Sequence, residues 1–133
     1  MRSRGTSART GGGRVFVSPL DVRLSEHDIV EPDVIVVAVD RIEIIKEKFM
    51  LGPPSLLVEV VSDPRTDRVR KRALYARSGV PEYWIVDPDA DRIEVHRLEA
   101  GRYGKPKIFE PDETLTTSVL HGFALSLADL FHR

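Results

Sequence analysis

Residues 55–88 have the sequence SLLVEVVSDPRTDRVRKRALYARSGVPEYWIVDP, in which two apolar runs flank a helical segment. The runs 55–63 and 82–88 are apolar on both faces, as expected of strands that are covered on each side. Between them, apolar residues recur at helical spacing until a glycine, which predicts a helix from 66 or 67 to 78. The apolar stripe of this helix consists of Val69, Ala73, Leu74 and Ala76. A strand, a helix and a second strand in this order indicate an α/β fold.

Outward from this stretch, the pattern continues as one domain over 14–133. Further strands are expected on either side of a Ser-Pro bend in RVFVSPLDVRL (14–24), in EPDVIVVAVDR (31–41), in RIEVHRL (92–98), in KIFEP (107–111) and in LTTSVL (115–120). RIEVHRL should pair with the preceding strand as a hairpin, and 126–131 should form a short helix capped by Ser126. The segment 42–50 fits a short helix or a loop, and 100–107 is expected to be a polar linker.

Composition sets limits on location and partners. The first 13 residues are rich in Gly, Ser, Thr and Arg, which predicts a flexible tail. No apolar run approaches the ~20 residues of a membrane span, and no hydrophobic stretch follows the first arginines, so neither a span nor a signal peptide is expected. The absence of cysteine fits a reducing compartment, and we expect a cytoplasmic protein. A net charge of -1 means that contacts to nucleic acid must come from local patches.

Glu59 is the most unusual residue, because it is a carboxylate in the middle of the aliphatic run LLVEVV. Burying an ionised carboxylate costs several kcal/mol unless it meets a cation, a hydrogen-bond network or a metal. One interpretation is therefore a structural ion pair with an arginine. The other is a metal ligand.

Asp33 and Lys71 are the candidates for a site around Glu59. Asp33 opens the preceding covered strand, and neighbouring strands can bring such positions together at one end of a sheet. Two carboxylates suit magnesium or manganese, although a Pro-Asp pair before a strand is commonly a turn or a cap. Lys71 lies on the following helix, where it fits either an i,i+4 pair with Asp67 or an ammonium that stabilises a phosphate under attack.

Other polar and aromatic residues have simpler interpretations. Tyr75, Tyr83 and Trp84 fit core aromatics better than base-stacking platforms. A basic helix face, made of Arg65, Arg68, Arg70, Arg72 and Arg77, could meet phosphates or remain solvated. The histidines, which are His27, His96, His121 and His132, have no metal-ligand spacing.

Three segments resemble the Uma-two family of bacterial endonucleases, a branch of the PD-(D/E)xK restriction-endonuclease-like superfamily. They are PD at 32–33, LLVEVVSDP at 56–64 and DRVRKRALYARSGVPEYWIVDP at 67–88. The resemblance runs from about Arg14 to the C-terminus. It implies a mixed central sheet flanked by helices.

The same resemblance implies site residues and a reaction. Asp33 and Glu59 would bind magnesium or manganese with the backbone carbonyl of Val60, and activated water would cleave a DNA phosphodiester. The superfamily lysine normally stands two residues after the acid, where this sequence has Val61. In this branch the lysine comes from the next helix, which makes Lys71 the candidate, with Arg70 in place of the usual acidic neighbour.

Relatives also begin with a helix and strands that carry another glutamate, whereas this sequence has its glycine-rich tail there. We therefore expect the fold without the N-terminal helix section, as in a truncated copy. Three hypotheses follow: a metal-dependent nuclease, a decayed nuclease fold that binds DNA or a protein, and a structural domain with a Glu59–arginine pair. Open sheet edges would also favour a homodimer.

Overall fold

The computed structural model describes residues 7–10, 13–61 and 68–132. In chain order its elements are β1 (Ser7–Thr10), β2 (Gly13–Val17), β3 (Asp21–Arg23), β4 (Ile29–Val30), β5 (Val34–Ala38), the 3-10 helix η1 (Val39–Ile44), β6 (Phe49–Leu51), β7 (Leu56–Val60), α1 (Arg68–Arg77), β8 (Glu82–Asp87), β9 (Arg92–Glu99), β10 (Arg102–Tyr103), β11 (Lys107–Phe109), β12 (Thr114–Thr116), β13 (Ala124–Ser126) and α2 (Leu127–Leu130).

A mixed sheet forms the centre of the molecule. Its strand order is β1-β2-β5-β7-β8-β9-β10, and β11 also pairs with β9. β7 and β8 run parallel, because α1 carries the chain back across the sheet between them, and the other neighbouring strands are antiparallel. The strands and the helix predicted in residues 55–88 are therefore confirmed over the described residues, as is the β8–β9 hairpin; residues 62–67 lie outside the described ranges.

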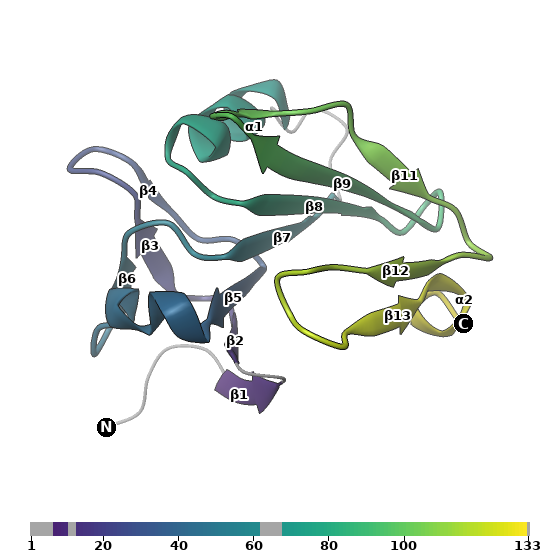
Figure 1. Ribbon diagram of the computed structural model, residues 1–133, viewed down its shortest axis with the longest axis horizontal. Coiled ribbons are helices and arrows are strands. Elements are labelled where there is room, and N and C mark those ends of the chain that lie inside the picture. Colours follow the sequence, from purple (N-terminus) through teal and green to yellow (C-terminus); the bar gives the residue numbers. More distant parts are fainter. Residues whose placement is uncertain (1–6, 11–12, 62–67, 133) are drawn as a thin grey trace.

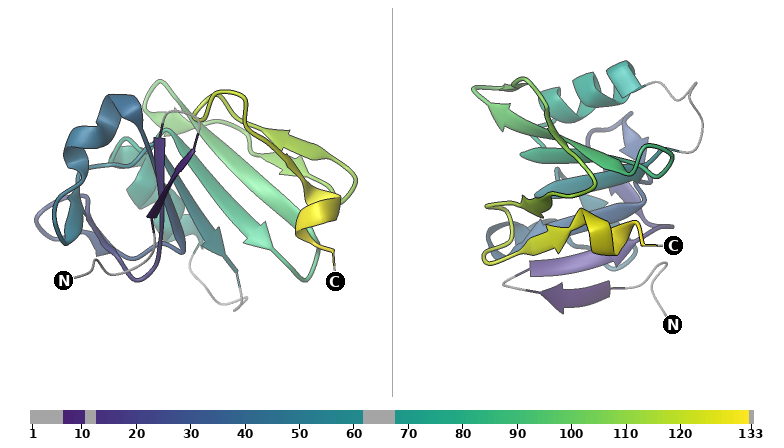
Figure 2. Two further views of the ribbon diagram at one scale, coloured as in Figure 1. Left: turned by 90° about the horizontal axis from the view of Figure 1, so that it is seen from below. Right: turned by 90° about the vertical axis from the view of Figure 1, so that its right-hand side faces the viewer.

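Each face of this sheet is covered by a different set of elements (Figures 1 and 2). On β8 the side chains alternate, so that Tyr83 and Ile85 join one core while Trp84 joins the other. The first core lies under α1 and the small sheet β4-β3-β6, and the second lies under the β12–β13 hairpin and α2. Coverage on both faces explains why β7 and β8 are nearly continuous apolar runs.

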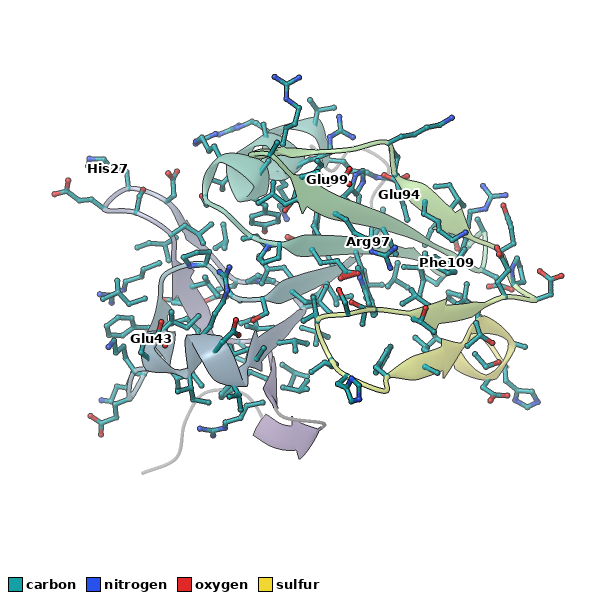
Figure 3. All side chains as sticks on the ribbon, in the orientation of Figure 1. His27, Glu43, Glu94, Arg97, Glu99 and Phe109 are labelled. Atoms are coloured by element: carbon teal, nitrogen blue, oxygen red, sulfur yellow. The ribbon has the colours of Figure 1, made fainter. Side chains whose placement is uncertain are left out.

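The C-terminal part covers the second core as a hairpin followed by one short helix. Ser126 caps α2 by accepting a hydrogen bond from the Asp129 backbone at 3.3 Å, as predicted. Figure 3 shows Arg97 between β9 and this hairpin, where its Nη2 donates to the Thr116 carbonyl at 2.8 Å. This contact ties the hairpin to the central sheet.

Two loop predictions are wrong in part. The predicted tail over 1–13 contains β1, which pairs antiparallel with β2, and Gly13 already belongs to β2. Backbone hydrogen bonds to a neighbouring strand order this polar sequence although its composition predicts a coil; residues 1–6 and 11–12 lie outside the described ranges. The predicted linker 100–107 contains β10, which extends β9 as a second hairpin.

Of the predicted apolar stripe of α1, only Leu74 packs against the first core. Val69 is 66% exposed, and Val69, Ala73 and Ala76 line an open groove beside Tyr103. Tyr75 is instead the buried residue of this helix. The face of α1 that meets the core therefore carries Leu74 and Tyr75, whereas the sequence pattern predicts a face made mainly of smaller side chains.

His96 provides a first testable prediction. Its side chain is 1% exposed, its Nε2 is bonded to Glu94 Oε2 at 2.6 Å, and its ring stacks on Tyr83. Burial lowers the pKa of His96, against the opposing effect of Glu94. The unfolded chain then binds a proton more readily than the native one, so stability should fall as the pH drops below about 6.5, the ordinary pKa of histidine.

Thermal unfolding followed between pH 7.5 and 5 measures this effect. His96→Gln retains a donor for Glu94 and should flatten the pH dependence, whereas His27→Gln, in an exposed loop (Figure 3), should leave it unchanged. An equal slope in wild type and His96→Gln would show that His96 contributes nothing to it.

Candidate active site

Glu59 lies on β7 with its side chain 13% exposed, and helix α1 supplies donors to both of its carboxylate oxygens. Lys71 Nζ lies 2.6 Å from Oε1, and the Tyr75 hydroxyl lies 2.5 Å from Oε2. A charge-assisted hydrogen bond and a second donor offset the cost of removing this carboxylate from water.

Local sequence explains why both donors reach the same carboxylate. Lys71 and Tyr75 are four residues apart, so they lie one above the other on the face of α1 that is turned toward the sheet. The helix ends at Arg77, two residues after Tyr75. Gly79 then adopts φ +86°, and the Val80 amide donates to the Tyr75 carbonyl at 3.0 Å. This is the glycine stop that the sequence predicts.

Asp33 directly precedes β5, at the end of the strand that lies beside Val60 of β7. β5 and β7 pair with Val34 opposite Val58, and one further step in this register sets Asp33 opposite Glu59. Opposite positions on an antiparallel pair share a face, with Cβ atoms about 4.5–5.5 Å apart. Continuing the register in this way makes the two acids cross-strand neighbours at one end of β5 and β7.

The backbone of Val60 joins this arrangement. Its amide donates to Asp33 Oδ2 at 2.7 Å, while the next amide, of Val61, turns the other way and donates to Val86 on β8 at 2.9 Å. In a strand the N–H and C=O of one residue point to the same neighbour. The Val60 carbonyl thus faces the side on which Asp33 lies.

Tyr75 remains a proton donor at every ordinary pH. Burial raises the pKa of its phenol far above the usual value, and the negative charge of Glu59 and their hydrogen bond add to this. The phenol ring is fully buried and packs edge-on against Tyr83, with ring centroids 4.8 Å apart.

The donor set suits a hard divalent cation. Within the ranges that the structure describes there is no cluster of three or more His, Cys, Asp or Glu side chains that could bind a metal. Asp33 and Glu59 offer hard oxygen ligands, and magnesium commonly uses one or two carboxylates and fills its remaining positions with water and substrate phosphate.

The structure places Lys71 in contact with Glu59, and it places Asp33 in contact with the backbone of Val60, the residue after Glu59. The cation that forms an ion pair with Glu59 is Lys71, whereas the structural interpretation of Glu59 expected an arginine. Asp67, the other proposed partner of Lys71, lies outside the described residues. Val61, at the position of the superfamily lysine, packs against the first core, so a lysine from α1 takes the place beside the acid.

Tyr75 is the site residue that the sequence analysis missed. It was assigned to the core, which is correct for its ring but leaves out its hydroxyl. The available signal was its position four residues after Lys71. Tyr83 and Trp84 are buried as predicted.

Several basic residues of α1 have partners among the described residues. Arg77 lies 3.7 Å from Asp28 across the surface, and Arg70 also has a partner. Arg65 lies outside the described residues. Of the histidines, His96 is buried in its pair with Glu94, as described above.

Comparisons with known proteins agree with this fold. A family model described as "Uma2: Putative restriction endonuclease" matches residues 4–128. Among solved structures, a putative nuclease belonging to DUF820 from Anabaena variabilis ATCC 29413 superposes with a TM-score of 0.72 and 23% identity, over 91% of this chain and 69% of that one. This likeness shows a nuclease-like mixed α/β fold. No curated protein matches the sequence.

Proposed function

The chain belongs to the Uma2 family, described as putative restriction endonucleases, and on this basis we propose that it is a metal-dependent endonuclease that hydrolyses phosphodiester bonds in DNA. One observation carries the proposal: Glu59 is a nearly buried carboxylate on a central strand, with Lys71 at 2.6 Å and Asp33 opposite in the β5–β7 register. An acid pair beside an ammonium is a suitable arrangement for binding a cation and a phosphate together.

Each site residue has a separate proposed role. Asp33, Glu59 and the Val60 carbonyl would hold magnesium or manganese, which when bound makes a water molecule more acidic and polarises the phosphate. Lys71, with its side chain 40% exposed, can reach a phosphate oxygen and stabilise the negative charge that develops there. Tyr75 keeps Glu59 in its orientation through a hydrogen bond.

DNA is the proposed substrate because α1, the helix that supplies Lys71 to Glu59, is rich in cations. The helix has no Asp or Glu, and its cations are Arg68, Arg70, Lys71, Arg72 and Arg77. Side chains of this kind bind phosphates with an affinity that falls steeply with salt. Since the net charge of the whole chain is -1, this local excess is what would attract a polyanion.

Location and assembly stay predictions. Within the described ranges, no helix has both the length and the apolar composition needed to cross a membrane. The cytoplasmic location rests on the absence of cysteine. The homodimer rests on sheet edges, of which β1 is one, since it stands at the end of the strand order.

Calorimetric titration with magnesium tests the proposal without requiring turnover. Asp33→Ala removes one of two carboxylates, so the affinity should fall at least about a hundredfold, more than the roughly 10–100-fold typical of losing an outer partner of a metal ligand. Asp40→Ala, an exposed acid at the start of η1, is the matched control and should bind as wild type does.

The same titration separates the enzyme from the alternative function. If the chain is a decayed nuclease fold that only binds DNA or a protein, titration of the wild type with magnesium should release no heat of binding. The titration of Asp33→Ala should then give the same result. That result would reject the metal-dependent nuclease and leave the binding module.

A further inference from the structure

Tyr75 and Lys71 both donate to Glu59, but they are not equivalent partners. Lys71 carries a positive charge on a side chain that is 40% exposed, whereas Tyr75 is a neutral phenol that is fully buried. A cation that binds Glu59 would repel the ammonium of Lys71. It would not repel the hydroxyl of Tyr75.

The position of the Tyr75 hydroxyl is fixed by packing. The ring meets Tyr83 edge-on at 79°, and the backbone carbonyl of Tyr75 accepts a hydrogen bond from Val80, whose side chain is also fully buried. A buried hydroxyl that loses its acceptor pays a desolvation cost, so this group favours the conformation in which Glu59 stays within reach.

The hydrogen bond from Tyr75 still allows the Glu59 carboxylate to bind a cation. Each carboxylate oxygen has two lone pairs, and one hydrogen bond to Oε2 uses one of them. Glu59 can therefore accept from Tyr75 and bind a metal at the same time, provided that its carboxylate does not turn.

We infer that Tyr75 is a positioning residue for Glu59: its hydroxyl holds the carboxylate in the orientation that binds a divalent cation, and it does so both before and after Lys71 is released toward a phosphate. This inference rests on the proposed function. It adds a residue that touches neither cation nor substrate and acts only through Glu59.

Tyr75→Phe tests this with a matched control in the same protein. The change removes one hydroxyl and keeps the ring. Tyr103→Phe removes a comparable hydroxyl, which donates to the Val80 carbonyl at 2.9 Å and not to Glu59. Both variants should lose similar thermal stability, because each leaves one acceptor without its donor.

Magnesium affinity distinguishes the two variants. By calorimetry, Tyr75→Phe should bind magnesium about 10–100-fold more weakly than wild type, as is usual for the loss of a group that orients a metal ligand. Tyr103→Phe should bind as wild type does. In a cleavage assay at saturating magnesium, Tyr75→Phe should recover most of its rate, since the defect is in holding the ligand and not in the chemistry.

Failure of this inference can be told apart from failure of the proposed function. If Glu59→Ala binds magnesium as wild type does, the metal site itself is wrong. If Glu59→Ala loses binding while Tyr75→Phe retains full affinity, only the role of Tyr75 is rejected. Should Tyr75→Phe not fold, a magnesium-loaded crystal structure of the wild type decides: a Glu59 carboxylate that has turned away from Tyr75 overturns the inference, and a retained bond supports it.

Discussion

Glu59→Ala should abolish magnesium-dependent nicking of supercoiled plasmid DNA, with a loss of about a thousandfold or more in rate. A catalytic metal contributes several kcal/mol of transition-state stabilisation, and each 1.36 kcal/mol is a factor of ten. Glu59 is the acid that both α1 donors converge on, so its removal takes away a ligand and the anchor of Lys71 together. The measurement is the initial rate of nicking with and without magnesium.

Glu47→Ala is the matched control for Glu59→Ala. Glu47 is an exposed acid in the loop before β6, so its removal changes the net charge equally and should leave the nicking rate unchanged. Nicking that persists in a pure preparation of Glu59→Ala would identify a contaminating nuclease and reject the assignment of Glu59.

Glu82→Ala should produce the largest loss of stability, about 3–5 kcal/mol of the free energy of unfolding. Glu82 is 2% exposed and accepts hydrogen bonds from Trp84 Nε1 at 3.0 Å, Arg97 Nε at 3.2 Å and Thr117 Oγ1 at 2.5 Å. Its removal leaves these donors without an acceptor. Equilibrium unfolding in urea, followed by the fluorescence of Trp84, measures the change.

Two variants check the reason for this loss. Glu110 forms an ion pair with Arg92 at 3.4 Å and is 48% exposed, so Glu110→Ala should cost less than about 1 kcal/mol. Glu82→Gln keeps one carbonyl acceptor and should fall between the two. A loss below about 1 kcal/mol for Glu82→Ala would mean that the three bonds do not hold the second core and its hairpin together.

The fold was largely predictable because its strands are covered on both faces. The runs LLVEV and EYWIVD give the parallel pair, and the helix between them follows from spacing and a glycine stop. β1 and β10 were missed because short polar edge strands are ordered by pairing with a neighbour, which composition does not record. The orientation of α1 was predicted only in part: Leu74 packs against the first core as expected, but the buried residue is Tyr75 and not Val69, Ala73 or Ala76.

The candidate site was predictable where a charged residue interrupts an apolar run in the sequence. Glu59 stands in the middle of an aliphatic run, which marks it at once. Glu82 is buried more completely but stands at the start of its run, where a carboxylate looks like a boundary. The role of the Tyr75 hydroxyl was not predicted, because a tyrosine whose ring packs in a core can still donate a hydrogen bond through its hydroxyl.

We propose that Asp33 and Glu59 bind one divalent cation together, and anomalous diffraction from a crystal of the wild-type protein grown with manganese can locate that cation. We expect one peak with oxygens of both carboxylates at about 2.1 Å, the distance expected for a hard cation of this size, and with Lys71 released from Glu59. A peak elsewhere, or no peak with Glu59 still closed on Lys71 and Tyr75, would contradict it.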